Sequence, residues 1–285
     1  MPTDVIATRQ GHLRSAAARL AAAGLPDAAR EAARLAETAW DLPHGTVRLH
    51  GGVPVEQEGA DALERILSRR LAGEPIAYVT GLAGFRRLVL RSDSRALIPR
   101  PETEGLVDLV LSRCTSGVAA DVCTGSGCVA LALADEGNFD RVLGADVSPS
   151  AIALARENGA RTGLRVEWRV GDLCTPLAGE RLDVLVANPP YLTDAEYAGL
   201  DPAVRDWEPE LALASGVDGL AATRRLFVAA GTLVRENGWI ALEVDCRRAG
   251  DVAVMAGGLG WAGAEVHEDL FGRARYVLAR RSVTS

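Results

Sequence analysis

Several features that define large protein classes are missing from this sequence of 285 residues. No apolar run approaches the roughly 18 residues of a membrane-spanning helix, so we expect no membrane segment. The four histidines show no metal-ligand spacing, which argues against a metal site. Positive charge is also scarce, because the chain has 31 Lys and Arg against 38 Asp and Glu. Its formal net charge is therefore -7. The basic field of non-specific nucleic-acid-binding proteins is therefore missing, and no direct contact with nucleic acid is expected.

The sequence also lacks cysteine pairs. Its five cysteines form no CxxC motif and their number is odd, which is typical of buried free thiols in a reducing cytosol. We therefore predict a cytoplasmic protein, with a monomer as the starting expectation. Residues 5–25 are rich in Ala and Arg, as in an organelle transit peptide. However, Leu13, Ala16, Ala17 and Leu20 fall on one helical face, so the first helix of a small bundle explains the same residues.

Three stretches of the chain carry different patterns. Up to about Gly73, apolar residues recur at helical spacing, as in Ala32, Leu35, Ala36 and Ala39, and predict a helical domain over residues 1–73. Residues 74–101 are punctuated by Gly and Pro, and the short runs 76–79 and 87–90 predict a β-hairpin linker. Residues 102–285 form a third region, in which strand and helix patterns alternate.

This third region predicts an α/β fold. Strands are expected at 118–122, 142–146, 166–170, 182–187 and 239–244, with helices starting at 129 and 150 and another across 219–235. Such alternation favours right-handed crossovers and a mainly parallel sheet that is covered on both faces. The runs 264–267 and 274–280 leave no room for a helix between them, so we expect an antiparallel strand at the end of the sheet.

A glycine-containing turn follows the first of these strands. Its residues are Cys123, Thr124, Gly125, Ser126 and Gly127, and glycines in such a turn let a nucleotide approach the backbone. Asp146 ends the next strand, where a carboxylate can accept hydrogen bonds from both ribose hydroxyls. Gly125, Gly127 and Ala130 also fit the dinucleotide fingerprint. A dehydrogenase, or a tight turn without a ligand, therefore stays open at this point.

Asp172 and Leu173, which follow the third predicted strand, could both contact an adenine ring. The Asp172 carboxylate could accept a hydrogen bond from the exocyclic amino group, and Leu173 would offer an apolar face to the ring. An ordinary turn aspartate explains Asp172 equally well.

The fourth strand runs directly into Asn188-Pro189-Pro190-Tyr191. Ligands of open α/β sheets bind beyond the carboxyl ends of the strands, which brings this tetrad to the nucleotide turn. The Asn188 side-chain oxygen and the Pro189 carbonyl can each accept one N–H of a planar NH2 group. Two prolines make that backbone rigid and remove competing donors, while Tyr191 can stack on the planar group. The tetrad therefore indicates a site that holds a planar nitrogen for methylation, although all its residues also suit a plain turn.

With these motifs the chain resembles the protein-glutamine N5-methyltransferases that modify peptide chain release factors, the HemK or PrmC family. The resemblance runs from Gly73 onward. It rests on residues 73–81, on Ile98 to Glu104, on the Gly125-Ser126-Gly127 turn, on Asp146 and the tetrad, and on residues 207–209 and 216–219. The tetrad alone is shared with adenine-N6 methyltransferases of nucleic acids.

The resemblance implies a class I methyltransferase with a Rossmann-like sheet, a helical domain that docks the protein substrate, and S-adenosylmethionine as cofactor, with S-adenosylhomocysteine as product. Residues 123–127, Asp146, Asp172, Leu173 and Asn188 would hold the cofactor. The target would be the glutamine of a Gly-Gly-Gln motif in release factors, and Arg100, Glu102 and Glu104 would line the entrance. A structural ion pair between Arg100 and Glu104 is an alternative.

The sequence departs from the family at four places. Cys123 and Cys128 stand where small residues are commoner, and residues 242–246 lack the usual glycine. Residues 85–87 lack the usual second aromatic residue, and the helical domain is weakly matched. A glutamine in another protein, adenine-N6 methylation of nucleic acid and a non-catalytic module of the same fold therefore remain as alternatives.

Overall fold

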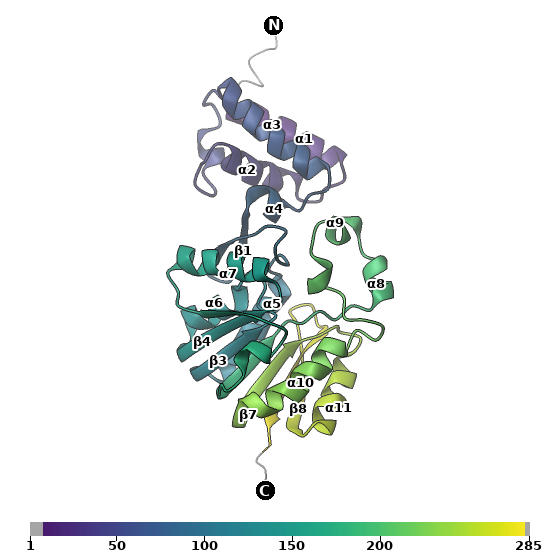
Figure 1. The fold of residues 1–285 in the computed structure, drawn as a ribbon. Coiled ribbons are helices and arrows are strands. Elements are labelled where there is room, and N and C mark those ends of the chain that lie inside the picture. The colour runs from purple at the N-terminus through teal and green to yellow at the C-terminus, as the bar shows by residue number, and fades with distance from the viewer. Residues whose placement is uncertain (1–7, 283–285) are drawn as a thin grey trace. The chain divides into compact units, whose positions relative to one another are not determined.

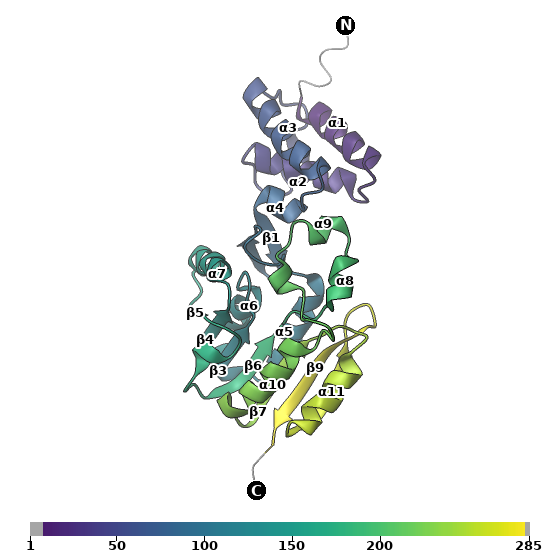
Figure 2. The same ribbon diagram turned by 45° about the vertical axis from the view of Figure 1, so that its right-hand side comes forward.

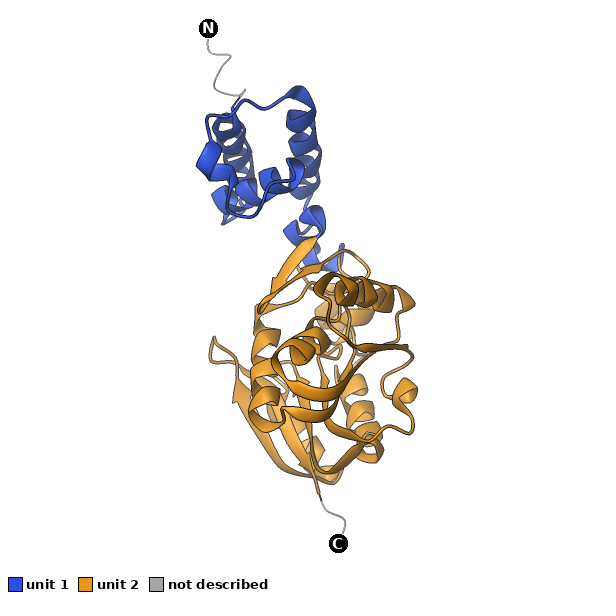
Figure 3. Cartoon of the chain, turned by 90° about the vertical axis from the view of Figure 1, so that its left-hand side faces the viewer, with its two compact units in different colours: residues 1–81, 202–207 blue, residues 82–201, 208–285 orange. Residues whose placement is uncertain are grey.

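The computed structural model describes residues 8–282, which form two compact units (Figures 1 and 3). The smaller unit holds the chain up to Gly81 together with Pro202–Trp207, and the larger unit holds Leu82–Asp201 and the chain from Glu208 onward. The helical unit continues to Gly81, whereas the sequence predicts that the helical domain ends at Gly73. None of the helices within residues 8–282 is long and apolar enough to cross a membrane.

The smaller unit is built from helices around an apolar core. They are α1 (Arg9–Ala22), α2 (Ala28–Ala39), the 3-10 helix η1 (Val47–His50), α3 (Gln57–Leu71), α4 (Ile76–Thr80) and α9 (Pro202–Arg205). Thr8 caps the start of α1, because its hydroxyl accepts a hydrogen bond of 3.2 Å from the Gly11 backbone nitrogen. Leu20, Leu35 and Leu63 are buried together. The apolar stripes of the sequence therefore face a common core.

Residues 76–79 do not form the strand that the sequence predicts. They lie in α4, whose first turn closes when the Pro75 carbonyl accepts hydrogen bonds from Tyr78 (2.9 Å) and Val79 (3.0 Å). Gly81 ends the helix in the left-handed conformation, with φ 71°. Val79 is buried in the helical core, and this burial outweighs the low helix propensity of β-branched residues.

The larger unit contains a seven-stranded sheet in the order β5-β4-β3-β6-β7-β9-β8. The strands are β3 (Ser116–Val122), β4 (Asn138–Asp146), β5 (Glu167–Val170), β6 (Leu182–Ala187), β7 (Val234–Glu243), β8 (Trp261–Glu268) and β9 (Ala274–Arg281). Strands β3 to β7 pair in parallel, and β9 runs antiparallel to both β7 and β8. The predicted parallel sheet with an antiparallel end is confirmed.

Helices cover both faces of this sheet (Figures 1 and 2). One face packs against α5 (Pro101–Arg113), α6 (Cys128–Glu136) and the hairpin β1 (Leu82–Phe85) and β2 (Leu88–Arg91), and the other against α10 (Ala221–Leu233) and α11 (Ala249–Gly258). Neighbouring strand residues alternate between the two cores, since Ala119 and Val184 lie in one while Ala120 and Leu185 lie in the other. The remaining elements are α7 (Pro149–Thr162), η2 (Thr175–Leu177), α8 (Asp194–Ala198) and η3 (Glu210–Ala212).

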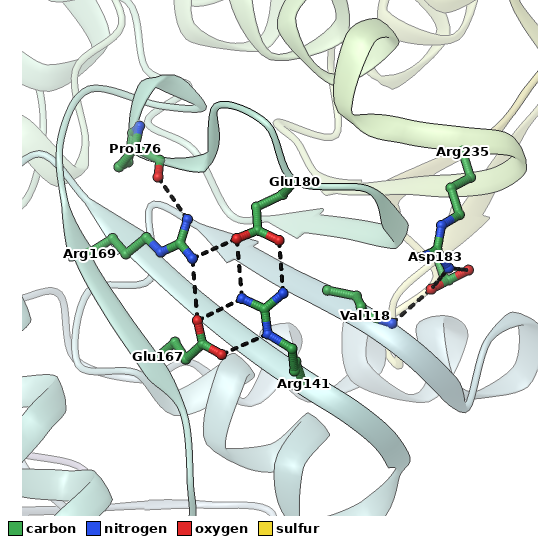
Figure 4. A network of polar contacts seen from close by, with 8 residues as sticks. All are labelled: Val118, Arg141, Glu167, Arg169, Pro176, Glu180, Asp183 and Arg235. Atoms are coloured by element: carbon green, nitrogen blue, oxygen red, sulfur yellow. Dashed lines mark hydrogen bonds and ion pairs between the residues drawn. The ribbon is translucent and has the colours of Figure 1, made fainter.

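A network of ion pairs links β4, β5 and the loop before β6 (Figure 4). Arg141 contacts Glu167 at 2.7 Å and Glu180 at 2.9 Å, and Arg169 contacts Glu180 at 2.6 Å. Glu180 and Arg169 are partly buried, whereas Arg141 and Glu167 are more exposed, and exposed ion pairs contribute little to stability individually. The charges of this network are paired with one another. The carboxyl groups whose pKa is raised, Asp121, Asp146 and Glu243, lie instead at or near the carboxyl ends of β3, β4 and β7.

Candidate active site

A cavity of about 310 Å³ lies at the carboxyl ends of the parallel strands in the larger unit. Its volume is in the range of small-molecule sites, and its wall is mainly apolar with a few polar groups. The predicted site residues that line it are Arg100, Cys123, Thr124, Gly125, Ser126, Asp146, Asp172, Leu173, Asn188 and Pro190. Those that lie outside its wall are Glu102, Glu104, Gly127, Pro189 and Tyr191.

The turn between β3 and α6 alternates in backbone conformation. Cys123, Gly125 and Gly127 all have positive φ, at 62°, 54° and 83°. A left-handed conformation costs a residue with a side chain roughly 1–2 kcal/mol, so Cys123 is strained. Leu173, which also lines the cavity, has φ 47°. Strain of this kind gathers at functional sites, and two of the strained residues with side chains lie in the wall of one cavity.

Asp121 holds the turn between β3 and α6 in place. One oxygen, Oδ2, accepts hydrogen bonds from the Thr124 hydroxyl at 2.5 Å and from the Ala130 backbone nitrogen at 3.1 Å. The second bond holds the first turn of α6, where the helix dipole favours negative charge. Burial raises the pKa of Asp121 to about 7 despite these bonds, because no cation among its partners offsets the lost hydration.

Gly127 serves packing rather than the cavity. A Cβ at this position would lie 2.7 Å from the ring of Trp168 and 3.1 Å from the Ala155 methyl group. At Gly125, by contrast, a Cβ would meet only the Ala96 methyl group, at 3.7 Å. Of the two glycines that the sequence assigns to the cofactor, Gly125 leaves open space beside the backbone and Gly127 lets the turn pack against the ring.

Asp146, the last residue of β4, links the turn between β3 and α6 to the residue that caps α7. Its Oδ2 accepts a hydrogen bond from the Gly125 backbone nitrogen and its Oδ1 one from the Ser148 backbone nitrogen, both at 2.9 Å. Burial raises the pKa of this carboxyl above its ordinary value, and the backbone donors act in the opposite direction. Each oxygen keeps a second lone pair, so two further donors from a ligand can be accepted.

Asp172 has an ion-pair partner that the sequence does not reveal. The guanidinium of Arg225, in α10, pairs with its Oδ2, and both side chains are at least half exposed at the edge of the cavity. The carboxylate is therefore held in place by a cation, while its Oδ1 stays available to another donor.

Asn188 stands at the end of β6 and is held by a chain of two hydrogen bonds. Its Nδ2 donates to the Thr103 hydroxyl at 3.2 Å, and this hydroxyl donates to Glu243 Oε2 at 2.7 Å. Thr103 and Glu243 are buried, 3% and 1% exposed. Burial raises the pKa of Glu243 to about 7. The NH2 side of the amide is thus engaged, and its oxygen is the group that remains for a ligand.

Tyr191 lies beside the cavity rather than in its wall. Its backbone nitrogen donates to the Leu213 carbonyl at 3.2 Å, which ties the tetrad to the segment before Ser215. Burial raises the pKa of the phenol to about 12, so it stays protonated at neutral pH. Pro189 is buried at the same turn.

The ion pair between Arg100 and Glu104 that the sequence allows is not formed. Arg100 pairs with the buried carboxylate of Glu208 at 2.5 Å, and Glu208 also accepts a hydrogen bond of 3.0 Å from the Ile98 backbone nitrogen. Glu104 instead accepts a hydrogen bond of 2.8 Å from the Arg86 backbone nitrogen in the hairpin turn. The physical reason is burial: Glu208 is only 4% exposed and needs a cation, whereas Glu104 is only partly buried.

The thiols near the cavity are poor nucleophiles. Burial, together with the nearby carboxylates Asp146 and Asp121, raises the pKa of Cys123 well above its ordinary value, and burial raises that of Cys128 to about 12. All five cysteines are free, and residues 8–282 contain no group of three or more His, Cys, Asp or Glu that could hold a metal ion. The departures at Cys123 and Cys128 therefore add apolar surface and no reactive thiolate.

Sequence reasoning missed Thr103, Glu243 and Glu208 as parts of the site, although all three stand in segments that it singled out. Glu243 carries a usable signal, because a lone carboxylate at the end of the apolar run Ile240 to Val244 must find a buried partner. Thr103 offers no comparable signal, since an ordinary helical threonine looks the same.

Two family models match the chain, "PrmC N-terminal domain" over residues 12–81 and "Methyltransferase small domain" over residues 102–200. The release factor glutamine methyltransferase of Cereibacter sphaeroides is 39% identical over 270 residues, 94% of this chain and 96% of the relative. That of Deinococcus radiodurans is 41% identical over 276 residues, 95% and 97% of the two chains.

Among solved structures, a methyltransferase from Pyrococcus furiosus aligns with a TM-score of 0.54 and 18% identity, over 77% of this chain and 100% of that one. The hMettl16 catalytic domain aligns with a TM-score of 0.54 and 16% identity, over 69% and 76%. At such identities the likeness concerns the fold alone, and the predicted Rossmann-like methyltransferase fold is confirmed. Identity near 40% over almost the whole length of both chains goes further: the chain belongs to the release factor glutamine methyltransferase family.

Proposed function

We propose that this enzyme transfers a methyl group from S-adenosylmethionine to the side-chain amide nitrogen, N5, of the glutamine in the Gly-Gly-Gln motif of peptide chain release factors. The observation that carries the proposal is the position of Asn188 and Asp146 in the wall of one cavity. The names of the relatives support the same substrate class. Because release factors act in translation, the proposal also places the enzyme in the cytoplasm.

The residues of the cavity fit S-adenosylmethionine. The free lone pairs of Asp146 suit the two ribose hydroxyls, and Gly125 leaves room beside the backbone for the methionine part. Asp172 Oδ1 suits the amino group of adenine, and Leu173 gives the ring an apolar contact. When bound, S-adenosylmethionine supplies a methyl group on a positively charged sulfur, which makes the methyl carbon electrophilic.

An amide nitrogen is a poor nucleophile because its lone pair is delocalised into the carbonyl group, so positioning is the main task of the protein. Asn188 Oδ1, in the cavity wall, accepts one N–H of the target amide and aims its nitrogen at the methyl carbon. The backbone carbonyl of Pro189, a residue outside that wall, would be the second acceptor of the proposal. Both acceptors also favour the positive charge that develops on the nitrogen. The proton leaves after transfer, when the nitrogen has become strongly acidic, so the site needs no strong base.

The proposal is tested with methyl-labelled S-adenosylmethionine and three separate acceptors: a release factor, the same factor with its Gly-Gly-Gln glutamine changed to glutamate, and adenine-containing DNA. Mass spectrometry then locates the label. We expect label on the glutamine of the unmodified factor and none on the other two acceptors. Label on adenine, or label on a release factor that no longer has this glutamine, would contradict the proposal.

A further inference from the structure

We infer that Thr103 and Glu243 are positioning residues that lock the side-chain amide of Asn188 in one orientation, with its oxygen toward the target nitrogen. The inference rests on the proposed function of the site and adds the residues that make Asn188 effective. Its basis is a chain of hydrogen bonds from Asn188 Nδ2 to Thr103 Oγ1 (3.2 Å) and from Thr103 Oγ1 to Glu243 Oε2 (2.7 Å).

The direction of this chain follows from counting donors. A carboxylate only accepts hydrogen bonds, so the single hydroxyl hydrogen of Thr103 points to Glu243. The hydroxyl oxygen can then only accept from Asn188, and it is the NH2 group of the amide that faces it. With the amide reversed, two oxygens without a shared hydrogen would face each other. The orientation of Asn188 is therefore determined by its partners, although the oxygen and nitrogen of an amide look alike.

Burial makes this lock effective. Thr103 is 3% exposed and Glu243 is 1% exposed, so water cannot take the place of either partner. The three residues come from the first turn of α5, the end of β6 and the end of β7. Three rigid elements therefore hold one side chain, whereas Asn188 alone could rotate about its terminal bond.

The charge of Glu243 also acts on Asn188 through the chain. A carboxylate strengthens the hydrogen bond that it accepts, and linked hydrogen bonds polarise one another. Polarisation of the amide draws electron density toward Asn188 Oδ1, which becomes a stronger acceptor for the target N–H. The same polarisation favours the positive charge that forms on the target nitrogen during methyl transfer.

Protonation of Glu243 would reverse the chain, because a neutral carboxyl can donate to Thr103 and free its hydroxyl hydrogen for the oxygen of Asn188. The charged and titratable groups around Glu243 are Arg100 and Glu102 at the start of α5, Cys128 in α6, Tyr191 after β6, and Arg275 and Tyr276 in β9. Burial outweighs the two arginines and raises the pKa of Glu243 to about 7. We expect kcat to fall as the pH drops below this value.

The test uses the full-length enzyme and four variants. Glu243→Gln removes the charge, Thr103→Val removes the hydroxyl at constant shape, and Thr103→Ser restores the hydroxyl. Glu236→Gln, at an exposed position of the same strand, is the matched control. Loss of a charge-assisted hydrogen bond corresponds to a roughly 10- to 100-fold lower kcat for Glu243→Gln and Thr103→Val. Thr103→Ser should stay within about 3-fold of the wild type, and cofactor affinity should change little in all variants.

The pH profile separates positioning from a merely structural role. In the wild type, kcat should decline on the acid side, and Glu243→Gln should be slow with this decline abolished. Unchanged kcat and an unchanged acid limb in Glu243→Gln would overturn the inference. If this variant does not fold, Thr103→Val decides, and turnover equal to that of the wild type would overturn the inference in the same way.

A second measurement does not depend on the substrate. In NMR spectra, the Asn188 NH2 group should give a hydrogen that exchanges slowly with water in the wild type and rapidly in Thr103→Val, with Asn188→Asp identifying the signal. Fast exchange in the wild type would overturn the lock even if methylation occurs. Slow exchange without methylation of a release factor would support the lock and count against the proposed function instead.

Discussion

Asp146 Oδ2 accepts a hydrogen bond of 2.9 Å from the backbone nitrogen of Gly125, so the last residue of one strand fixes the turn that follows the neighbouring strand. The two strands pair in parallel, with Val122 opposite Ala145, and this register brings the carboxylate to the turn. The proposed ribose acceptor and the open space at Gly125 therefore form one rigid feature, and we expect a change in either to weaken binding of the whole cofactor.

Replacement of Asp146 by alanine should weaken cofactor binding. The variant loses two charge-assisted acceptors for the ligand and releases the Gly125 backbone. We expect a roughly 10- to 100-fold higher Kd for S-adenosylmethionine, which corresponds to about 1.5–3 kcal/mol. Isothermal titration calorimetry measures the change, with the exposed Asp140→Ala as control. A Kd equal to that of the wild type in a folded variant would argue against the assigned role.

Replacement of Asn188 by alanine should separate binding from turnover. The proposed cofactor contacts of Asp146 and Gly125 do not involve Asn188, so we expect the Kd for S-adenosylmethionine to stay within about 3-fold of the wild type. Turnover should fall by at least about 100-fold, as when an oriented polar group is removed from other active sites. Initial rates with a release factor, measured at saturating cofactor, give this value. Equal turnover by the variant would refute the role of Asn188.

Gly127 and Gly163 allow the effects of crowding and backbone conformation to be separated. Both have positive φ, 83° and 73°, but a Cβ at Gly127 would meet the Trp168 ring at 2.7 Å, whereas nothing lies within 4 Å at Gly163. Gly163→Ala should therefore lower the free energy of unfolding by about 1 kcal/mol, through strain alone. Gly127→Ala should lower it by roughly 1–3 kcal/mol more. Urea unfolding measures both, and equal losses would show that the Trp168 ring yields without penalty.

Asp121 should give stability a distinct pH dependence. Its folded pKa of about 7 exceeds the ordinary value of 3.8, so the folded state binds more protons than the unfolded state between these values. Stability from this group is present below about pH 4 and is lost as the pH rises toward 7. Asp121→Asn cannot titrate.

The difference in unfolding free energy between the wild type and Asp121→Asn should therefore shift in favour of the variant from pH 5 to pH 7, by at most about 1.4 kcal/mol for each pH unit. Chemical unfolding at several pH values measures this difference, and the contribution of Glu243 cancels because both proteins contain it. A difference that stays constant with pH would show that Asp121 is ionised throughout this range.

Local patterns were sufficient for the sheet and for much of the cavity wall. Each strand is a short apolar run, and parallel strands bring their carboxyl ends to one edge, so Asp146 and Asn188 could be expected near each other without any knowledge of strand order. The helix α11 escaped notice because its ten residues include three glycines, which weaken the helical pattern.

Contacts between distant residues could not be predicted in this way. Thr103 and Glu243 are 140 positions apart, and Thr103 and Asn188 are 85 apart. Their meeting depends on the placement of β7 next to β6 and on the packing of α5 against the sheet, which no local pattern specifies. The alternative ion pair between Arg100 and Glu104 fails for the same reason, because Glu104 is near Arg100 in sequence while Glu208 is near it in space.

The path of the chain between the two units limits how the protein can be divided. The chain leaves the helical unit after Gly81, returns to it for Pro202–Trp207 and leaves it again at Glu208. Division of the chain at one position cannot give either unit complete. Removal of the residues before Leu82, for example, would leave α9 without the rest of its unit. Exchange of the helical unit for that of a relative therefore requires a two-segment graft whose second junction adjoins the buried carboxylate of Glu208.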